Sequence, residues 1–484
     1  MLESLLTSDG TQTRVRPAVV AGAFYPADEK SLRGMMDQML AQLPAAAAAA
    51  PDVALVAPHA GYIYSGPVAA YAYQTLAGRS FQRVVVIAPS HAEAFSYSSI
   101  YDGDAYSTPL GQIAIDRDFA RMLAASHTSI RLSSHGHMPT PQGAEHAVEV
   151  QLPWLQRMLG SFTLVPIVMG DASYAASRAL GMALAAHCGA ETLIVASSDL
   201  SHYHPYDEAV RMDHQTLDAI AAWDYFSLAR NIESRQWEAC GGAPIVAAMI
   251  AARRLGANHS QVLRYANSGD TAGPRDRVVG YGAVALTHSP QADAGQETFT
   301  LSDADKAALL ALARSAVETA VRERRTVEPA TSQSAALLAE RGAFTTLHRH
   351  GQLRGCIGFT APRKSLAETI RDTAILAALR DPRFAPVQTA ELADLEYEIS
   401  VLSPLTPVLD PHTIRVGEDG LLIKQGEREG LLLPQVPVEW KWDREKFLQQ
   451  TCHKAGLPND AWKDAETDIF SFTAVVFGEK KPVH

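Results

Sequence analysis

The sequence predicts a layered α/β domain with a mostly parallel sheet, followed by a smaller α+β domain. In the first part of the chain, short runs of Val, Ile, Leu and Ala alternate with helical segments. Nearly continuous apolar runs are typical of strands buried on both faces, and strand–helix alternation is typical of parallel sheets. Further along, strands and helices follow in mixed order, which indicates an α+β fold. The chain has 484 residues, of which 47% are hydrophobic, so each domain can bury a core.

Strands and helices of the first domain are expected from these apolar patterns. The expected strands lie at residues 53–57, 83–88, 162–168, 192–196, 262–266 and 278–286. The expected helices lie at residues 144–158, 209–220 and 245–255. Pro244 suits the first turn of the last helix. Six alanines at 45–50 stand between two prolines and are expected to form a connector or a helix end without function.

A segment rich in small polar residues with Pro and Gly, residues 289–299, is expected to be the interdomain linker. The first domain then covers residues 14–288 and the second covers residues 300–480. In the second domain, His350-Gly351 is a turn dipeptide, expected between strands at 343–348 and 353–360. Further helices are expected at 303–324, with Ser302 as its N-cap, and at 365–380, and further strands at 396–402, 421–424, 431–433 and 470–477.

Charge and cysteine content exclude several classes of function. The net charge is -11 and the pI is about 5.9, so nucleic-acid and anionic-membrane binding are not expected, because both need a basic surface. The four cysteines form no CxxC pair, which excludes zinc ribbons and iron–sulfur motifs. So few cysteines fit a reducing compartment. Without an apolar leader or a membrane-spanning run, we expect a cytoplasmic protein.

Polar side chains follow three of the expected strands where each strand ends. His59 follows the strand at 53–57, His91 follows the strand at 83–88, and Asp199 and His202 follow the strand at 192–196. In open α/β sheets, ligands bind outside the carboxyl ends of the strands. Cys240 precedes the helix at 245–255, where a thiol pKa is expected to fall, and the two glycines after it permit a close backbone approach.

This set of residue types is suited to a metal ion. Two imidazoles and a thiolate or carboxylate leave a fourth position open, as in catalytic sites. The set admits Fe(II), Cu or Zn, and His202 is a candidate general acid or base beside the metal. Each residue also has an ordinary structural interpretation: a hydrogen-bonded loop histidine, a cysteine that only packs, or Asp199 capping a turn.

Glu145, His146 and Glu149 share the helix expected at 144–158, with the two carboxylates four residues apart on one face. They are candidates for hydrogen-bonding and orienting metal-bound imidazoles. A solvated helix face with a buried His146 explains the same pattern.

These stretches resemble the Memo family over about residues 14–288. The resemblance rests on 57–62, 88–91, 145–149, 197–202 and 240–245, with the opening 16–26. It implies a fold similar to class III extradiol dioxygenases and iron or copper redox chemistry. It further implies that His59, His91 and Cys240 are metal ligands, with Asp199 and His202 beside them as catalytic residues. Ala92 departs from the family, in which many members have a second histidine there.

The second domain resembles the AMMECR family over about residues 300–480. The matching motifs are Leu353-Arg354-Gly355-Cys356-Ile357-Gly358, then 381–384 and 430–436. The two families accompany a radical SAM protein in the grouping called AmmeMemoRadiSam, and this chain looks like its proteins B and A fused. It carries no radical SAM cysteine motif, so the resemblance implies that this partner is a separate chain.

Cys356 is a candidate catalytic residue of the second domain. Its flanking glycines permit the close approach of a ligand, and Arg354 is a candidate to bind an anion or to lower the thiol pKa. The alternative is a glycine-bearing strand with a buried, inert cysteine.

Three functions are compatible with these residues. The first is an iron or copper redox enzyme, dioxygenase-like, that acts with a radical SAM partner on an unidentified small molecule. The others are a non-catalytic metal-binding scaffold for that partner and a zinc-dependent hydrolase. The sequence leaves the substrate, the metal and the oligomeric state open, and it is compatible with an oligomer.

Overall fold

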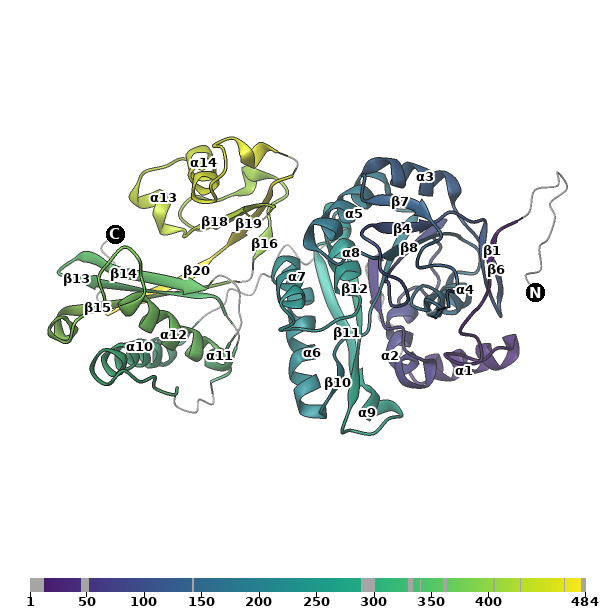
Figure 1. Ribbon diagram of the computed structural model, residues 1–484, viewed down its shortest axis with the longest axis horizontal. Coiled ribbons are helices and arrows are strands. Elements are labelled where there is room, and N and C mark those ends of the chain that lie inside the picture. Colours follow the sequence, from purple (N-terminus) through teal and green to yellow (C-terminus); the bar gives the residue numbers. More distant parts are fainter. Residues whose placement is uncertain are drawn as a thin grey trace. The chain divides into compact units, whose positions relative to one another are not determined.

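The computed structural model describes residues 13–44, 52–141, 143–288, 301–329, 334–339, 341–359, 364–403, 405–426, 428–464 and 466–479. The chain divides into two compact units, residues 1–296 and 297–484, which Figure 1 draws in purple to teal and in green to yellow. The predicted alanine connector at 45–50 and the predicted linker at 289–299 lie outside the described residues.

A nine-stranded sheet is the centre of the first unit, in the order β10-β12-β2-β9-β3-β8-β4-β7, with β11 also paired to β12. Its middle is parallel and consists of β2 (Asp52–Ala57), β9 (Thr192–Ser197), β3 (Arg83–Pro89) and β8 (Thr163–Met169). The strands on either side are β12 (Val278–Thr287), β11 (His259–Asn267), β10 (His202–His204), β4 (Ser98–Tyr101) and β7 (Ile130–Ser133).

The prediction of a mostly parallel sheet holds for this middle and for the edge pair of β4 and β7, and the other pairs are antiparallel. β12 runs antiparallel to β2 and pairs antiparallel with β11, and β4 runs antiparallel to β8. All six predicted strands are present. Their direction was wrong at the edges because an apolar run that is buried on both faces has the same composition in either orientation.

Helices cover both faces of this sheet, as expected for a three-layer α/β domain. α8 (Gly242–Arg254) packs on the sheet together with α5 (Tyr174–His187), and α2 (Tyr62–Gln74) and α4 (Leu152–Leu159) cover the opposite face. Gly181 lets α5 approach α8 closely, since an added Cβ would lie 2.7 Å from the carbonyl oxygen of Ala247. The other helices are α1 (Glu29–Ala41), α3 (Arg117–Ser126), α6 (Tyr206–Ala221), α7 (Tyr225–Glu233) and α9 (Ser268–Thr271).

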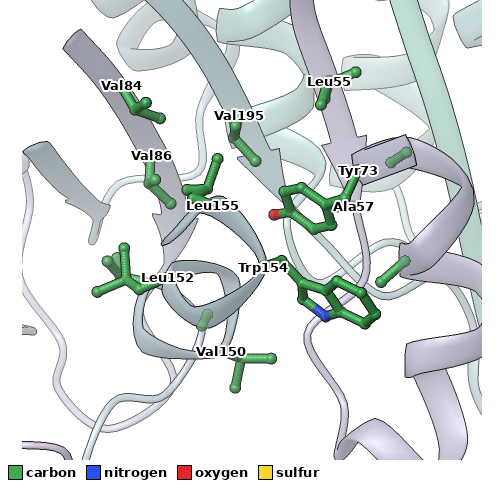
Figure 2. Close-up of a cluster of buried hydrophobic side chains, with 14 of the residues drawn as sticks. Leu55, Ala57, Tyr73, Val84, Val86, Val150, Leu152, Trp154, Leu155 and Val195 are labelled. Carbon is green, nitrogen blue, oxygen red and sulfur yellow. The ribbon is translucent and has the colours of Figure 1, made fainter. Parts of the chain in front are cut away.

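The core between α2, α4 and the sheet is centred on Trp154, which is fully buried. Its ring stacks on Tyr73 at 5.7 Å between centroids, and Figure 2 shows both rings beside the strand residues Leu55 and Val195. This packing fixes α2 and α4 on the sheet against β2, β3 and β9, the strands whose carboxyl ends carry the candidate site. A small three-stranded sheet of β1 (Val15–Arg16), β5 (Ala105–Thr108) and β6 (Gly111–Ala114) completes the unit.

The helix predicted at 144–158 is wrong in its first half. Glu145 to Val148 is not helical, Glu149–Gln151 is a 3₁₀ turn, and α4 begins only at Leu152. The Glu145 side chain accepts hydrogen bonds from the backbone N–H groups of His146 and Ala147, an alternative to helical hydrogen bonding. Pro153 then occupies the first turn of α4, where a proline is tolerated.

The second unit is α+β, as predicted, and contains two four-stranded sheets. The first sheet is β14 (Gln352–Phe359), β13 (Ala343–Arg349), β15 (Leu395–Leu402) and β20 (Ala474–Gly478), and α10 (Asp303–Glu323) and α12 (Leu366–Leu379) pack on it. The second sheet is β16 (Thr406–Pro407), β19 (Asp468–Phe472), β17 (Gly420–Gln425) and β18 (Arg428–Leu432). The remaining helices are α11 (Ala335–Leu338), α13 (Gln435–Glu439) and α14 (Arg444–Lys454), and 3₁₀ segments lie at Thr389–Asp394, Pro411–Thr413 and Ala461–Lys463.

The turn and the helix cap predicted in this unit are confirmed, whereas one predicted strand is wrong. His350 and Gly351 both have positive φ, of 51° and 76°, in the turn between β13 and β14. Ser302 caps α10 as expected. The strand predicted at 470–477 is instead two strands, β19 and β20, which belong to different sheets on either side of Thr473. None of the described helices has the length and apolarity that crossing a bilayer requires.

Candidate metal centre

Three candidate metal ligands converge at the carboxyl ends of the parallel strands, as the sequence predicts. His59 follows β2, His91 follows β3, and Cys240 lies two residues before α8. One ligand atom of each lies within 4.8 Å of the others. The close approach of Cys240 depends on Gly241, where an added Cβ would lie 2.2 Å from the carbonyl oxygen of Ser197. The sequence analysis expects the glycines after Cys240 to permit a close backbone approach, and Gly241 does so against Ser197.

His59 is the most deeply buried of the three, with 2% of its surface exposed. Its Nδ1 lies 2.9 Å from Ser197 Oγ and its Nε2 lies 3.1 Å from Cys240 Sγ. Burial, and then the neighbouring His91, lower its pKa to about 3. His59 is therefore neutral at physiological pH, which is the form in which an imidazole binds a metal.

His91 is held by Glu145, whose Oε1 lies 3.1 Å from His91 Nδ1. Burial raises the pKa of Glu145, but hydrogen bonds from His91 and from backbone N–H groups outweigh it and lower the pKa to about 2. Glu145 is thus an ionised carboxylate that can only accept, so His91 Nδ1 carries a proton, and Nε2 is the unprotonated nitrogen once the ring is neutral. The structure places Glu145 against a candidate ligand, where the sequence analysis expects it.

The predicted contact of Glu149 with an imidazole is wrong. Glu149 is fully buried and forms an ion pair with Arg16. It also accepts hydrogen bonds from the backbone N–H groups of Val19 and Val20 and from Tyr25 Oη. Because the segment from Glu145 to Glu149 is not one helix, the two carboxylates do not share a face. Glu149 therefore anchors the chain around residues 16–25 and does not orient a ligand.

His146 lies among the candidate ligands, although the sequence analysis placed it behind them. Its ring stacks on His91 at 4.9 Å between centroids and lies 5.3 Å from the ring of His59. Burial, and then the neighbouring His59, lower its pKa to about 4. His91, Glu145 and His146 form a second group with metal-ligand spacing. Because Glu145 already accepts backbone hydrogen bonds and His91 Nδ1, the group with Cys240 is the better metal site.

The prediction of a lowered pKa for Cys240 is wrong for the metal-free protein. Burial, and then the nearby Asp199, raise the pKa of this thiol. The helix N-terminus is outweighed because Cys240 is partly buried beside His59 and the Asp199 carboxyl group. A metal ion would reverse this preference, because a coordinated thiol loses its proton.

Asp199 and His202 lie beside the cluster, where the sequence analysis expects them. Asp199 Oδ1 accepts the backbone N–H of His59 at 2.8 Å, and the Asp199 N–H donates to Cys240 Sγ at 3.3 Å. Burial raises the pKa of Asp199. His202 begins β10 and is half-buried, and its backbone N–H donates to Glu238 Oε2 at 3.1 Å.

In the second domain, Arg354 does not act on Cys356 as predicted. Arg354 is hydrogen-bonded to Glu391, with Nε 3.0 Å from Oε1, so its charge is already paired. Burial raises the pKa of the Cys356 thiol, and the cation that opposes this is Arg383. Thr346 Oγ1 donates a hydrogen bond to Cys356 Sγ at 3.2 Å. Sequence spacing could not identify Arg383, because it lies on another segment.

Asp381 covers the edge of β14 that, among the described strands, has no partner, since β14 pairs there with β13 alone. Its Oδ2 accepts the backbone N–H of Cys356 at 2.8 Å and it forms an ion pair with Arg383. We expect Asp381→Ala to destabilise the second domain by about 1–3 kcal/mol, because a half-buried N–H group loses its partner. Urea unfolding measures this change. An exposed pair on the same unit gives the control, Asp303→Ala beside Lys306, and an equal effect of both variants would contradict the prediction.

The fold and the site together define an α/β domain built around a candidate metal centre, joined to an α+β domain. A family model described as Memo-like protein matches residues 16–285, and the chain belongs to this family. A second model, AMMECR1, matches residues 310–477, so the chain is a fusion of a Memo-like domain and an AMMECR1 domain.

Each of the following relatives matches part of this chain over nearly its own whole length. A MEMO1 family protein of Sulfolobus acidocaldarius is 37% identical over 285 residues, which cover 56% of this chain and 98% of that protein. A protein of Thermococcus onnurineus is 49% identical over 184 residues, which cover 36% of this chain and 90% of that protein. The crystal structure of an uncharacterized protein from Pyrococcus horikoshii is 44% identical and covers 36% of this chain and 91% of its own, with a TM-score of 0.35.

Proposed function

We propose that the first domain is a metal-dependent redox enzyme that holds iron or copper on His59, His91 and Cys240. The observation that carries this proposal is the convergence of their ligand atoms within 4.8 Å. Protein nitrogens and sulfurs lie about 2.0–2.3 Å from a bound transition metal, so ligands of one ion lie within twice that distance of each other. The residues therefore fit a metal ion with only small movements.

The chemistry of the donors supports an open, reactive site rather than a structural one. Three protein ligands leave a position for substrate or water. Iron or copper, when bound, would supply one-electron and dioxygen chemistry, and the similarity to extradiol dioxygenases that the family implies agrees with it. Asp199, with its raised pKa, can hold a proton beside the cluster, and the half-buried His202 can exchange protons with solvent.

The second domain and a partner extend this proposal. By family resemblance, the chain would act with a separate radical SAM protein of the AmmeMemoRadiSam grouping, on an unidentified small molecule. Cys356 stays a predicted catalytic residue of the second domain, although its thiol is protonated. Fusion raises the effective concentration of one domain near the other, which favours a shared intermediate.

Metal content tests the proposal. Protein purified without oxygen is expected to hold about one iron or copper per chain, and His59→Ala and Cys240→Ala are expected to lose it. The loss should exceed the roughly 10–100-fold that follows from removing a group hydrogen-bonded to a ligand. His127→Ala is the matched control, because His127 is exposed and bonds only locally to Ser129. Unchanged metal content in the two site variants would contradict the proposal.

A zinc-dependent hydrolase is the second candidate, favoured by the mixed thiolate and imidazole donors, which also suit zinc. Colourless protein that is loaded with zinc and shows no redox response would support this function. A third outcome is a scaffold, in which the radical SAM partner binds equally to wild type and to the site variants. Normal partner binding with lost activity in those variants would exclude the scaffold.

Metal affinity is expected to rise by at least about tenfold per pH unit between pH 6 and 8. The pKa of Cys240 is raised by burial, so a bound metal must displace the thiol proton. Metal affinity therefore increases as the pH rises. Burial lowers the pKa of His91, but the hydrogen bond and charge of Glu145 raise it by more. The His91 proton therefore steepens the slope at the acid end. Competition titrations with a chelator at three pH values measure the slope, and a flat profile would argue against thiolate ligation.

A further inference from the structure

A buried serine at the end of β9 contacts the candidate ligand His59. Ser197 is fully buried, and its Oγ has three hydrogen-bond partners. The carbonyl oxygen of Ala147 lies at 2.6 Å, Gln151 Nε2 at 2.7 Å and His59 Nδ1 at 2.9 Å. A hydroxyl has one proton to give and two lone pairs to receive. The three partners therefore use the full capacity of this hydroxyl.

The direction of each hydrogen bond follows from what the partners can do. A carbonyl oxygen only accepts, so the Ser197 proton goes to Ala147. The Gln151 amide is oriented by two further carbonyls, since its Nε2 also lies 3.0 Å from the oxygen of Pro58 and 3.3 Å from that of Ala57. Its Oε1 accepts from Tyr73 Oη at 2.5 Å. Ser197 Oγ is left as an acceptor toward His59, so His59 Nδ1 must carry the ring proton.

We propose that Tyr73, Gln151 and Ser197 are positioning residues that hold His59 as its Nδ1–H tautomer. The proposal rests on the proposed function, because a bare Nε2 matters for metal binding. The bare nitrogen is the atom that lies 3.1 Å from Cys240 Sγ. Histidine in water prefers the proton on Nε2, which would face the metal position and block it. This chain of hydrogen bonds from Tyr73 through Gln151 to Ser197, called the relay below, therefore reverses the preference of the free imidazole for a proton on Nε2.

The same arrangement appears at His91 with different chemistry. There the Glu145 carboxylate accepts Nδ1–H, so in the neutral His91 ring Nε2 is the unprotonated nitrogen. Both candidate histidine ligands thus offer Nε2 to a metal. The tautomer of His91 is fixed by the charged acceptor Glu145, and that of His59 by the neutral relay that begins at Tyr73. A neutral acceptor beside His59 adds no charge to the fully buried side of the cluster. Groups that fix a ligand's tautomer in this way raise metal affinity without contacting the metal.

Ser197→Ala tests the relay in the metal-free protein. Nitrogen NMR of ¹⁵N-histidine-labelled protein, with the His59 signals assigned from His59→Gln, is expected to show Nδ1–H in wild type. In Ser197→Ala the proton is expected to move to Nε2 in a substantial part of the molecules. Tyr73→Phe keeps the ring and removes only the far end of the relay, so a smaller change is expected. A wild-type Nε2–H tautomer, or an unchanged tautomer in Ser197→Ala, would overturn the proposal.

Binding of Zn²⁺ alone gives the second readout. Ser197→Ala is expected to bind Zn²⁺ about 10–100-fold more weakly than wild type. Ser177→Ala is the matched control, because Ser177 in α5 is also buried and its hydroxyl donates to the carbonyl oxygen of Ser173, the N-cap of that helix. Equal weakening in both variants would show a general loss of stability and would overturn the relay. If wild type binds no metal but the tautomer still shifts, the proposed function fails while the relay stands.

Discussion

Replacing Arg16 with Leu is expected to destabilise the first domain by about 3–5 kcal/mol. Arg16 and Glu149 form an ion pair in which the side chains are 1% and 0% exposed. Without the guanidinium, the Glu149 carboxylate would stay buried with only neutral donors around it, or would have to take up a proton. Arg16 also donates to the carbonyl oxygen of His137 at 2.8 Å and to that of Glu145. The substitution therefore also loosens the segment that holds His91.

Urea unfolding of the full chain measures this effect, and hydrogen exchange of peptides from α4 assigns it to the first domain. Arg14→Leu is the matched control, because Arg14 pairs with Asp102 at the surface and its side chain is 55% exposed. The control should change stability by no more than about 1 kcal/mol. If the Arg16 and Arg14 variants unfolded at the same urea concentration, the buried pair would have no special role.

The location of the candidate site could be predicted from sequence because it follows from the geometry of the sheet. β2, β9 and β3 are parallel neighbours, so the residues after their ends must meet. His59, His91 and Asp199 were each placed by this rule alone. Cys240 was placed by a different local signal, a glycine pair before an apolar helix. Short-range pattern and one topological rule were therefore enough to bring these four residues together.

Properties that depend on distant partners could not be predicted in the same way. The partner of Glu149 is Arg16, more than a hundred residues away, and no spacing rule connects them. The pKa of Cys240 depends on how deeply the fold buries it, and burial opposes the helix N-terminus. Arg354 was assigned to Cys356 by proximity in sequence, but the guanidinium of Arg354 forms an ion pair with Glu391, which lies on another segment. In each case the competing interaction is tertiary.

The second large effect is expected for Gly241→Ala, which should weaken metal binding by about 10–100-fold or more. The glycine has φ -97°, an ordinary value, so the backbone itself would accept alanine. The obstacle is packing, because the new Cβ would lie 2.2 Å from the Ser197 carbonyl oxygen and 2.6 Å from Ser198 Cβ. Both neighbours belong to the segment that ends β9 and cannot move without disturbing Asp199. The Cys240 loop must therefore retreat from His59.

Gly34→Ala separates this effect from the general consequences of adding a methyl group. Gly34 is exposed in α1 and has no atom within 4 Å of its added Cβ. In a helix interior, alanine is favoured over glycine by about 0.5–1 kcal/mol, so this control should keep its metal and gain slight stability. Gly241→Ala should lose stability by about 1–3 kcal/mol because the strand end is overpacked. Metal retained in Gly241→Ala, measured beside Gly34→Ala, would mean that the 3.1 Å contact between Cys240 and His59 is not needed for binding, and Cys240 would cease to be a ligand.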